Sequence, residues 1–125
     1  MMRASMVNIS LRTIGNVTVL DLEGRMTVER ESPDKVLSGV VRGLLEQGRN
    51  QVVLNLAQVT HLDTLGLSEI VEAYLVTSRR GGALKLEHLS AHIQTLLRTT
   101  RLSAVLQAFE SEAEAVTACA KEPRH

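Results

Sequence analysis

The sequence predicts an α/β fold in which helices pack on a mainly parallel β-sheet. Short runs rich in β-branched and apolar residues alternate with segments whose apolar residues recur at helical spacing. Two strand-like runs precede the first helical segment, which predicts an antiparallel hairpin at the start of the sheet. The chain has 125 residues, which suffice for one hydrophobic core but not for two. We therefore expect a single domain over residues 1–125, with its core in about residues 7–120.

The opening hairpin is predicted from two β-rich runs, Val7 to Ile14 and Val17 to Leu22. Gly15-Asn16 lies between them and suits the backbone of a two-residue turn. Along the second run, alternate residues form one clearly apolar face and one mixed face. We therefore expect both faces of this strand to be partly covered.

The first helix is predicted to begin at Pro33, which follows a serine suited to capping and fits the first helical position. Apolar residues from Val36 to Leu45 recur on one helical face, and Gly48 is a natural terminator. The short apolar run from Gln51 to Leu56 then predicts a buried parallel strand, followed by a loop over residues 57–62.

The remaining elements follow from the same patterns. They are a helix over residues 65–80 that ends at Gly81-Gly82, a strand over residues 83–87, a helix capped by Ser90, a short edge strand over residues 105–109, and a last helix that begins with the capping-box spacing of Ser111 and Glu114. The order ββαβαβαβα predicts a mixed, mostly parallel sheet of four to five strands with about four helices.

Composition narrows the classes of function. Aromatic residues make up 2% of the chain, and 14 basic residues balance 14 acidic ones, so neither stacking platforms nor a basic surface for nucleic acid is expected. No apolar run is long enough to span a bilayer, and Cys119 is the one cysteine, so we expect a cytoplasmic protein without membrane insertion or an intrachain disulfide. The spacings of Cys and His predict no metal site, and we expect no cofactor. No nucleophile–base pair or paired carboxylates can be named, so no catalytic residue is expected.

The most informative segment runs from Leu56 to Leu67, from the end of a buried strand into a helix. Strand-to-helix loops of α/β sheets are favoured places for ligand and partner sites. Asp63 or Thr64 would lie at the helix start, where backbone N–H groups lack intrahelical partners and the helix dipole favours negative charge. A phosphate on Thr64 would find hydrogen-bond donors there.

Val52 to Leu56 followed by His61 to Leu67 resembles the strand and the Asp-Ser/Thr-x-Gly-Leu helix start of STAS domains, especially of bacterial anti-sigma factor antagonists. Arg80 to Leu86 and Leu97 to Leu106 also match that layout, so the resemblance covers roughly residues 17–119. It implies a partner switch in which the unphosphorylated protein binds a serine/threonine kinase that doubles as an anti-sigma factor, which frees the sigma factor. A phosphatase would be a second partner, and the protein itself would be a monomer or a weak dimer.

Carried over to this chain, the resemblance places Thr64 at the phosphorylated hydroxyl position and Asp63 at its acidic neighbour. Gly66 takes the place of the small residue that lets the partner backbone come close. The partner-binding residues expected on this basis are Thr27, His61, Asp63, Thr64, Leu65, Gly66 and Leu67.

Two departures from the family pattern stand out. Gly24-Arg25-Met26-Thr27 places a neutral hydroxyl where the family often has an acid, which puts any role of that acid in doubt. Thr64 replaces the more frequent serine, and its β-branch narrows the rotamers open to the hydroxyl.

Three other readings stay open. Asp63 and Thr64 are ordinary capping residues and could serve only to start the helix. The chain could be a STAS scaffold or accessory subunit without phosphorylation, for example bound to an ABC transporter ATPase or a signalling complex. It could also bind a nucleotide or lipid ligand in the neighbourhood of Thr27 and Thr64.

Overall fold

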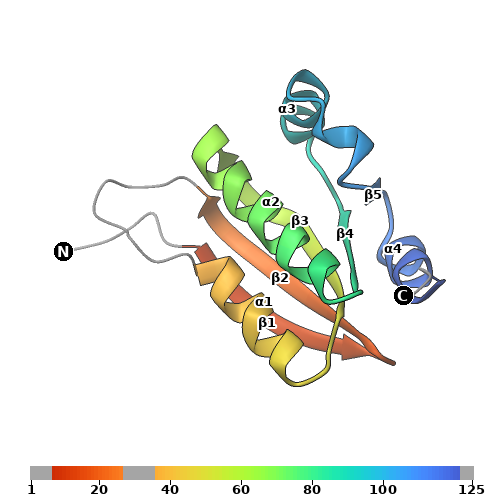
Figure 1. Cartoon of the computed structure of the whole chain (residues 1–125). Coiled ribbons are helices and arrows are strands. Elements are labelled where there is room, and N and C mark those ends of the chain that lie inside the picture. The colour runs from red at the N-terminus through yellow and green to blue at the C-terminus, as the bar shows by residue number, and fades with distance from the viewer. Residues whose placement is uncertain (1–6, 27–35, 122–125) are drawn as a thin grey trace.

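The structure is a computed structural model that describes residues 7–26 and 36–121. Five strands form one sheet in the order β1-β2-β3-β4-β5, with β1 antiparallel to β2 and each later pair parallel (Figure 1). The strands are β1 (Val7–Ile14), β2 (Val17–Met26), β3 (Gln51–Leu62), β4 (Ala83–Glu87) and β5 (Ala108–Phe109). The predicted hairpin and mixed sheet are confirmed.

The helices cover both faces of this sheet. They are α1 (Val36–Glu46), α2 (Thr64–Arg79), α3 (Ala91–Thr99) and α4 (Glu112–Lys121), with a short 3₁₀ helix, η1 (Leu102–Ala104), after α3. The helices α1 and α2 lie side by side on one face, whereas α4 packs on the other (Figure 1). The sheet is therefore the middle layer between two helical layers.

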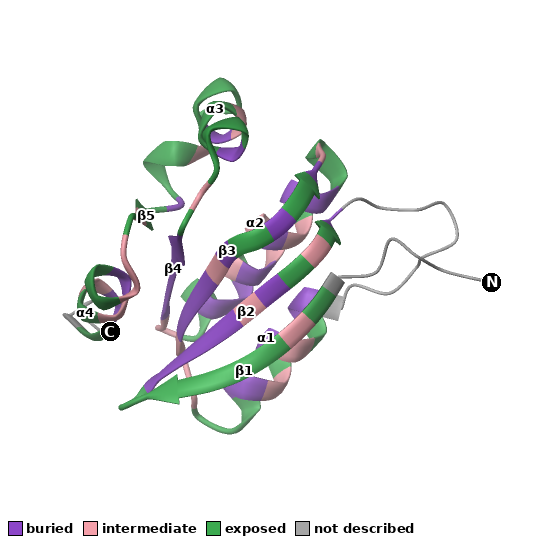
Figure 2. Ribbon diagram, turned by 180° about the vertical axis from the view of Figure 1, so that it is seen from behind, coloured by how far each residue is buried: buried purple, intermediate pink, exposed green. Residues whose placement is uncertain are grey.

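Each face has its own hydrophobic cluster, and alternate residues of the strands point to opposite clusters. The larger cluster lies under α1 and α2 and includes Leu20, Leu54 and Leu86. The smaller cluster lies under α4 and consists of Val17, Val19, Val53, Ala83, Ala115 and Cys119. The expectation that both faces of the second strand are covered is confirmed, as the buried start of β2 shows (Figure 2).

The strand β3 is longer than predicted, and the expected loop over residues 57–62 is wrong. Beyond Leu56, β3 stays paired with a similarly extended β2, up to the pair Met26 and Leu62. The register shifts twice on the way, so the buried residues after Leu56 are Val59 and Leu62, three positions apart. Strand patterns are recognised by a period of two, and bulges break that period. The extension brings the ends of β2 and β3 together at the start of α2.

The other elements differ from their predictions at the ends. The helix α2 begins one residue earlier than predicted, β4 and the caps of α3 and α4 are confirmed, and the predicted start of the first helix at Pro33 lies outside the described residues. Of the predicted edge strand over residues 105–109, only Ala108 and Phe109 pair with β4. The backbone N–H groups of Val105 and Leu106 instead donate to Leu102 O, because η1 extends the preceding turn.

Gly82 allows the beginnings of β3 and β4 to approach each other. A Cβ atom at this position would lie 2.1 Å from Asn50 O, which already accepts a hydrogen bond from Ala83 N at 2.9 Å. Real Cβ atoms do not come so close to a backbone oxygen, so the two strands would have to separate.

We therefore expect Gly82→Ala to lower the free energy of unfolding by at least about 2 kcal/mol, measured by urea denaturation. Gly39→Ala is the matched control, because Gly39 is exposed in α1 and its Cβ would meet nothing within 4 Å. Alanine there should raise the free energy of unfolding by about 0.5 to 1 kcal/mol. Equal effects of the two substitutions would contradict the close contact at Gly82.

Candidate functional site

The candidate site lies where β3 ends and α2 begins, and Asp63 makes the turn between them. Its backbone is extended, with φ −105° and ψ −178°, and its Oδ1 atom accepts a hydrogen bond from Gly66 N at 2.7 Å. Its carbonyl oxygen accepts the first helical hydrogen bond, from Leu67 N at 2.8 Å. Asp63 is therefore the N-cap of α2, and Thr64 is the first helical residue.

Gly66 fixes the start of α2 against the end of β2. A Cβ atom at this position would lie 1.7 Å from Met26 O, so only glycine permits this packing. Gly66 is buried, and its close contact is with the backbone of its own chain. Leu67 is also buried, with 3% exposure, and belongs to the larger hydrophobic cluster. Both residues shape the site from inside rather than at its surface.

The exposed part of the site consists of His61, Thr64 and Leu65, which we call the α2 surface. Leu65 is 55% exposed, the highest value among the exposed large hydrophobic residues that the structure describes. No hydrogen bond of the Thr64 hydroxyl is found among residues 7–26 and 36–121. The neighbouring hydroxyls differ, since Ser68 Oγ donates to Leu65 O at 2.6 Å and Thr60 Oγ1 donates to Gly24 O at 3.3 Å.

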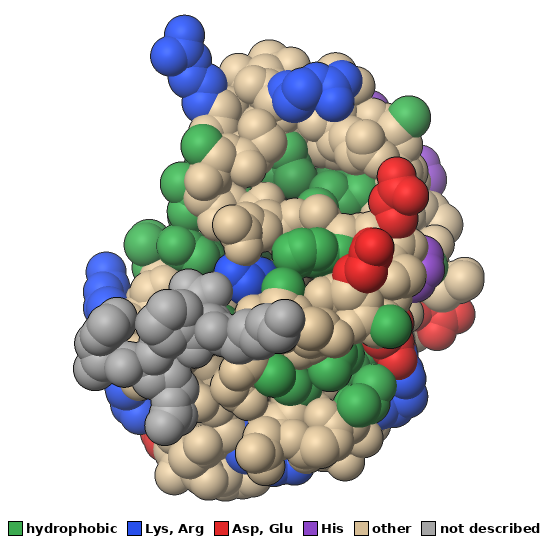
Figure 3. Space-filling view, turned by 90° about the vertical axis from the view of Figure 1, so that its right-hand side faces the viewer, with side chains coloured by type: hydrophobic (Ala, Val, Ile, Leu, Met, Phe, Trp, Pro, Cys, Tyr) green, Lys and Arg blue, Asp and Glu red, His purple; other side chains and the backbone are tan. Residues whose placement is uncertain are grey.

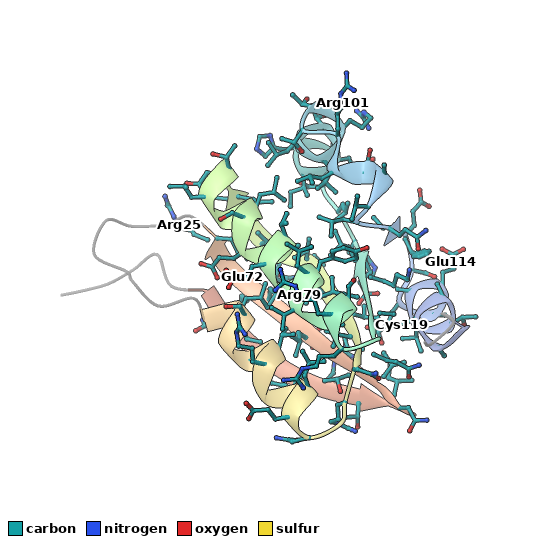
Figure 4. All side chains as sticks on the ribbon, in the orientation of Figure 1. Arg25, Glu72, Arg79, Arg101, Glu114 and Cys119 are labelled. Carbon is teal, nitrogen blue, oxygen red and sulfur yellow. The ribbon has the colours of Figure 1, made fainter. Side chains whose placement is uncertain are left out.

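Arg25 is a residue of this region that the sequence analysis did not select. It is exposed near the end of β2, where it pairs in register with His61 across to β3, close to the first turn of α2 (Figure 4). The predicted partner residue Thr27 lies outside the described residues. The bulged extension of β2 and β3 is what places Arg25 here, and a predicted loop over residues 57–62 gave no reason to pair the two segments.

A second polar cluster, also missed in the sequence, lies on the opposite face of the sheet at the first turn of α4. Arg12 in β1 binds Asp21 in β2, with Nε to Oδ2 at 2.6 Å, and binds Glu112 in α4, with Nη2 to Oε1 at 2.6 Å. Hydrogen bonds from Arg12 hold the pKa of Asp21 and of Glu112 below their ordinary values. Glu87 is fully buried and pairs in register with Asn55, which donates a hydrogen bond to Asp21. In sequence, polar residues that break otherwise apolar strands were the available sign of this cluster.

A pocket of about 630 Å³ lies between α3, η1 and β5. Its lining includes His88, Arg98 and Phe109. On this side of the molecule, hydrophobic side chains gather across the middle and acidic ones lie to one side (Figure 3). The ligand site considered near Thr27 and Thr64 is thus not this pocket. Within the described parts of the chain, no group of three or more His, Cys, Asp or Glu side chains could hold a metal ion, and no helix is long and apolar enough to cross a membrane.

Comparison with known proteins assigns the chain to a family. The model of the STAS domain family matches residues 8–115, so the chain belongs to the STAS domain family. A search among curated proteins finds no match.

Solved structures with this fold include several anti-sigma factor antagonists. The chain is similar to one from Mycobacterium paratuberculosis, with a TM-score of 0.78 at 13% identity over 97% of this chain and 100% of the other. A putative anti-sigma factor antagonist from Thermotoga maritima gives 0.76 at 21% identity over 90% and 95%. The phosphorylated form of SpoIIAA from Bacillus gives 0.66 at 14% identity over 89% and 98%. At these identities the likeness establishes the shared fold.

The capping role of Asp63 can be separated from its charge. Asp63→Ala removes the acceptor for Gly66 N and should lower the free energy of unfolding by about 1 kcal/mol. Asp63→Asn keeps an acceptor and loses only the favourable charge at the helix start, so we expect a loss of about 0.3 kcal/mol. Urea denaturation of both variants measures the difference, and equal losses would show that the hydrogen bond to Gly66 does not stabilise α2.

Proposed function

We propose that this protein is an anti-sigma factor antagonist that binds a serine/threonine kinase with anti-sigma activity, and that phosphorylation of Thr64 ends this binding. The observation that carries the proposal is the division of roles at the start of α2. Asp63 caps the helix, whereas Thr64 is exposed and its hydroxyl is not used for capping. A hydroxyl needed only to start the helix would be expected to accept a hydrogen bond from the first turn. Here it is available to a kinase.

The α2 surface suits a protein partner when Thr64 is unmodified. Leu65 offers an apolar contact, and the neutral hydroxyl of Thr64 costs less to desolvate than a charged group would. Gly66 and Leu67 lie beneath and hold this turn in place, so the partner would meet a surface that is already ordered. This explains how a small area around one helix start can bind specifically.

A phosphate on Thr64 would change the charge of the surface without displacing the helix. It adds about −1.5 to −2 charges beside the Asp63 carboxylate, so a partner shaped for the neutral hydroxyl would meet repulsion and a desolvation cost. Asp63 occupies Gly66 N and Leu67 N, and the N–H groups of Thr64 and Leu65 are the first-turn donors that these bonds do not take. These donors, the helix dipole and nearby Arg25 favour an anion at this place. The fold of SpoIIAA is similar to this chain in its phosphorylated and unphosphorylated forms, with TM-scores of 0.66 and 0.68.

The switch would operate in the cytoplasm with two partners, the kinase and a phosphatase that restores the hydroxyl. The alternative is an accessory role in a transporter or signalling complex, without phosphorylation. The experiment must distinguish this role from the phosphorylation switch. The kinases to test are the anti-sigma serine/threonine kinases of the organism that makes this chain, each purified and paired with the full chain.

Incubated with that kinase and ATP, the parent protein should gain one phosphate, and Thr64→Ala should gain none in intact-protein mass spectrometry. Thr60→Ala is the matched control, because Thr60 is also exposed near the start of α2 and its loss should leave phosphorylation unchanged. Thr64→Glu should weaken kinase binding at least about tenfold in calorimetry, since it places a charge where the partner meets a hydroxyl.

Two results would count against the proposal. If Thr64→Ala is phosphorylated as well as the parent protein, the site is wrong. If none of the kinases binds the parent protein, and it instead co-purifies with a transporter ATPase, the accessory role is favoured.

A further inference from the structure

The face of the sheet beneath α4 carries a row of polar residues that crosses three strands at one level. Asp21 in β2 pairs in register with Asn55 in β3, and Asn55 pairs with Glu87 in β4. Asn55 Nδ2 donates to Asp21 Oδ1 at 2.7 Å, which ties the first two members together. The row lies next to the small apolar cluster that holds Ala115 and Cys119 of α4. The first turn of α4 therefore docks on polar side chains and its later turns on apolar ones.

Arg12 neutralises only part of this row. Its guanidinium donates to both carboxyl oxygens of Asp21, at 2.6 and 2.9 Å, and to both of Glu112, at 2.6 and 3.1 Å. One positive charge thus lies between two carboxylates, and Glu87 is a third acid in the same cluster. With all three acids ionised, the cluster would carry two more negative charges than positive ones.

Glu87 is the member whose charge has no evident compensation. Its side chain is fully buried, and neither carboxyl oxygen has a hydrogen-bond partner in the part of the chain that the structure describes. A cationic candidate is His88, with Nδ1 at 3.5 Å from Glu87 Oε1. Buried polar atoms in native proteins are almost always hydrogen-bonded, and an ionised carboxylate can only accept. A proton on Glu87 would supply the missing donor.

Electrostatics agree with this reading. Burial and the neighbouring Glu112 raise the pKa of Glu87 to about 7. The charge of Arg12 acts in the opposite direction but is already shared by Asp21 and Glu112, and Asp21 adds to the repulsion. A protonated Glu87 can donate to Glu112, which remains ionised because Arg12 binds it.

We propose that Glu87 carries a proton and donates it in a hydrogen bond to Glu112, and that this bond fastens the first turn of α4 to β4 in a pH-dependent way. Loss of the proton would leave a buried charge facing Glu112 and Asp21, which favours release of α4 from the sheet. Other charged groups on the elements packed here are Arg12 on β1, Lys85 and His88 at β4, Glu110 after β5, and Glu112 and Glu114 on α4. Of these, Lys85 Nζ donates to Gln107 Oε1 at 2.5 Å, and Glu110 and Glu114 are exposed. The proposal does not depend on phosphorylation of Thr64.

The direction of the pH effect follows from the raised pKa of Glu87. Because the pKa of Glu87 rises on folding from 4.5 to about 7, its contribution to docking is complete below about pH 4.5 and is lost as the pH rises through 7. Asp21 and Glu112 have lowered pKa values, so their contributions are lost as the pH falls. The interval from pH 6 to 8 therefore isolates Glu87 from the other two acids, and His88 needs its own control.

Cys119 provides a direct measure of α4 docking. It is the one cysteine of the chain, it is fully buried, and its Sγ lies 3.5 Å from Ala83 O in β4 (Figure 4). The protection factor is the rate at which a thiol reagent labels Cys119 in urea, divided by the labelling rate in the native protein at the same pH. Because both rates are measured at one pH, the effect of thiol ionisation cancels. From pH 6 to pH 8, this factor should fall about tenfold in the parent protein.

Three variants make the experiment specific. Glu87→Gln keeps a donor in place and cannot ionise, so its protection factor should change less than about twofold over the same interval. Glu114→Gln makes the same chemical change on an exposed position of the same helix and should retain the tenfold fall. His88→Asn suits the positive φ of 61° at this position and should retain the fall as well.

The proposal is overturned if the parent protein shows no fall, if Glu87→Gln shows the same fall as the parent, or if His88→Asn abolishes it. A measurement that needs no variant checks the same point. In carbon-13 NMR of the parent protein, the Glu87 carboxyl carbon should titrate near pH 7. A titration midpoint between pH 4 and 5 would contradict the proposal that Glu87 keeps its proton.

Discussion

The contact between Gly66 and the carbonyl oxygen of Met26 is the constraint on which the candidate site depends. It brings the first turn of α2 against the end of β2, closer than any side chain at position 66 would allow. The extended pairing of β2 and β3 up to Met26 and Leu62 supplies the other half of the arrangement, because it carries both strand ends to the same place. Asp63 turns the chain into the helix from this place, and Thr64, the first helical residue, is exposed.

The architecture could be predicted because its elements repeat simple patterns. Apolar residues at helical spacing identified α2 to within one residue, and the Gly81-Gly82 turn separated it from β4. The end of β3 could not be predicted in this way, since two register shifts change the spacing of Val59 and Leu62. Periodicity detects regular strands, and the irregular part of β3 is the part that builds the site.

The sequence predicted which residues belong to the site, but not which atoms those residues contact. The family pattern indicated Asp63, Thr64 and Gly66 together. Sequence alone does not show which backbone segment comes close to a glycine. The pattern suggested a partner's backbone for Gly66, and the structure adds that the backbone of Met26 in the same chain approaches it. Glu87 was missed for a related reason. An acid at the end of a strand is usually exposed, but Glu87 is fully buried, between its strand neighbours Asn55 and Phe109.

Negative charge lies in different surroundings at the starts of α2 and α4. At α2, the first turn faces water, so a phosphate on Thr64 would be stabilised by free N–H groups and screened by solvent, and its effect would fall on a docking partner. At the first turn of α4, Glu87 is fully buried whereas the Glu112 side chain is 29% exposed, and Arg12 compensates only part of the negative charge because it binds both Glu112 and Asp21. A buried acid whose carboxyl oxygens lack a hydrogen-bond partner, as those of Glu87 do among the described residues, is stabilised by keeping its proton. Under the two proposals, an added charge would therefore change a partner interface at the start of α2 and the docking of the helix at the start of α4.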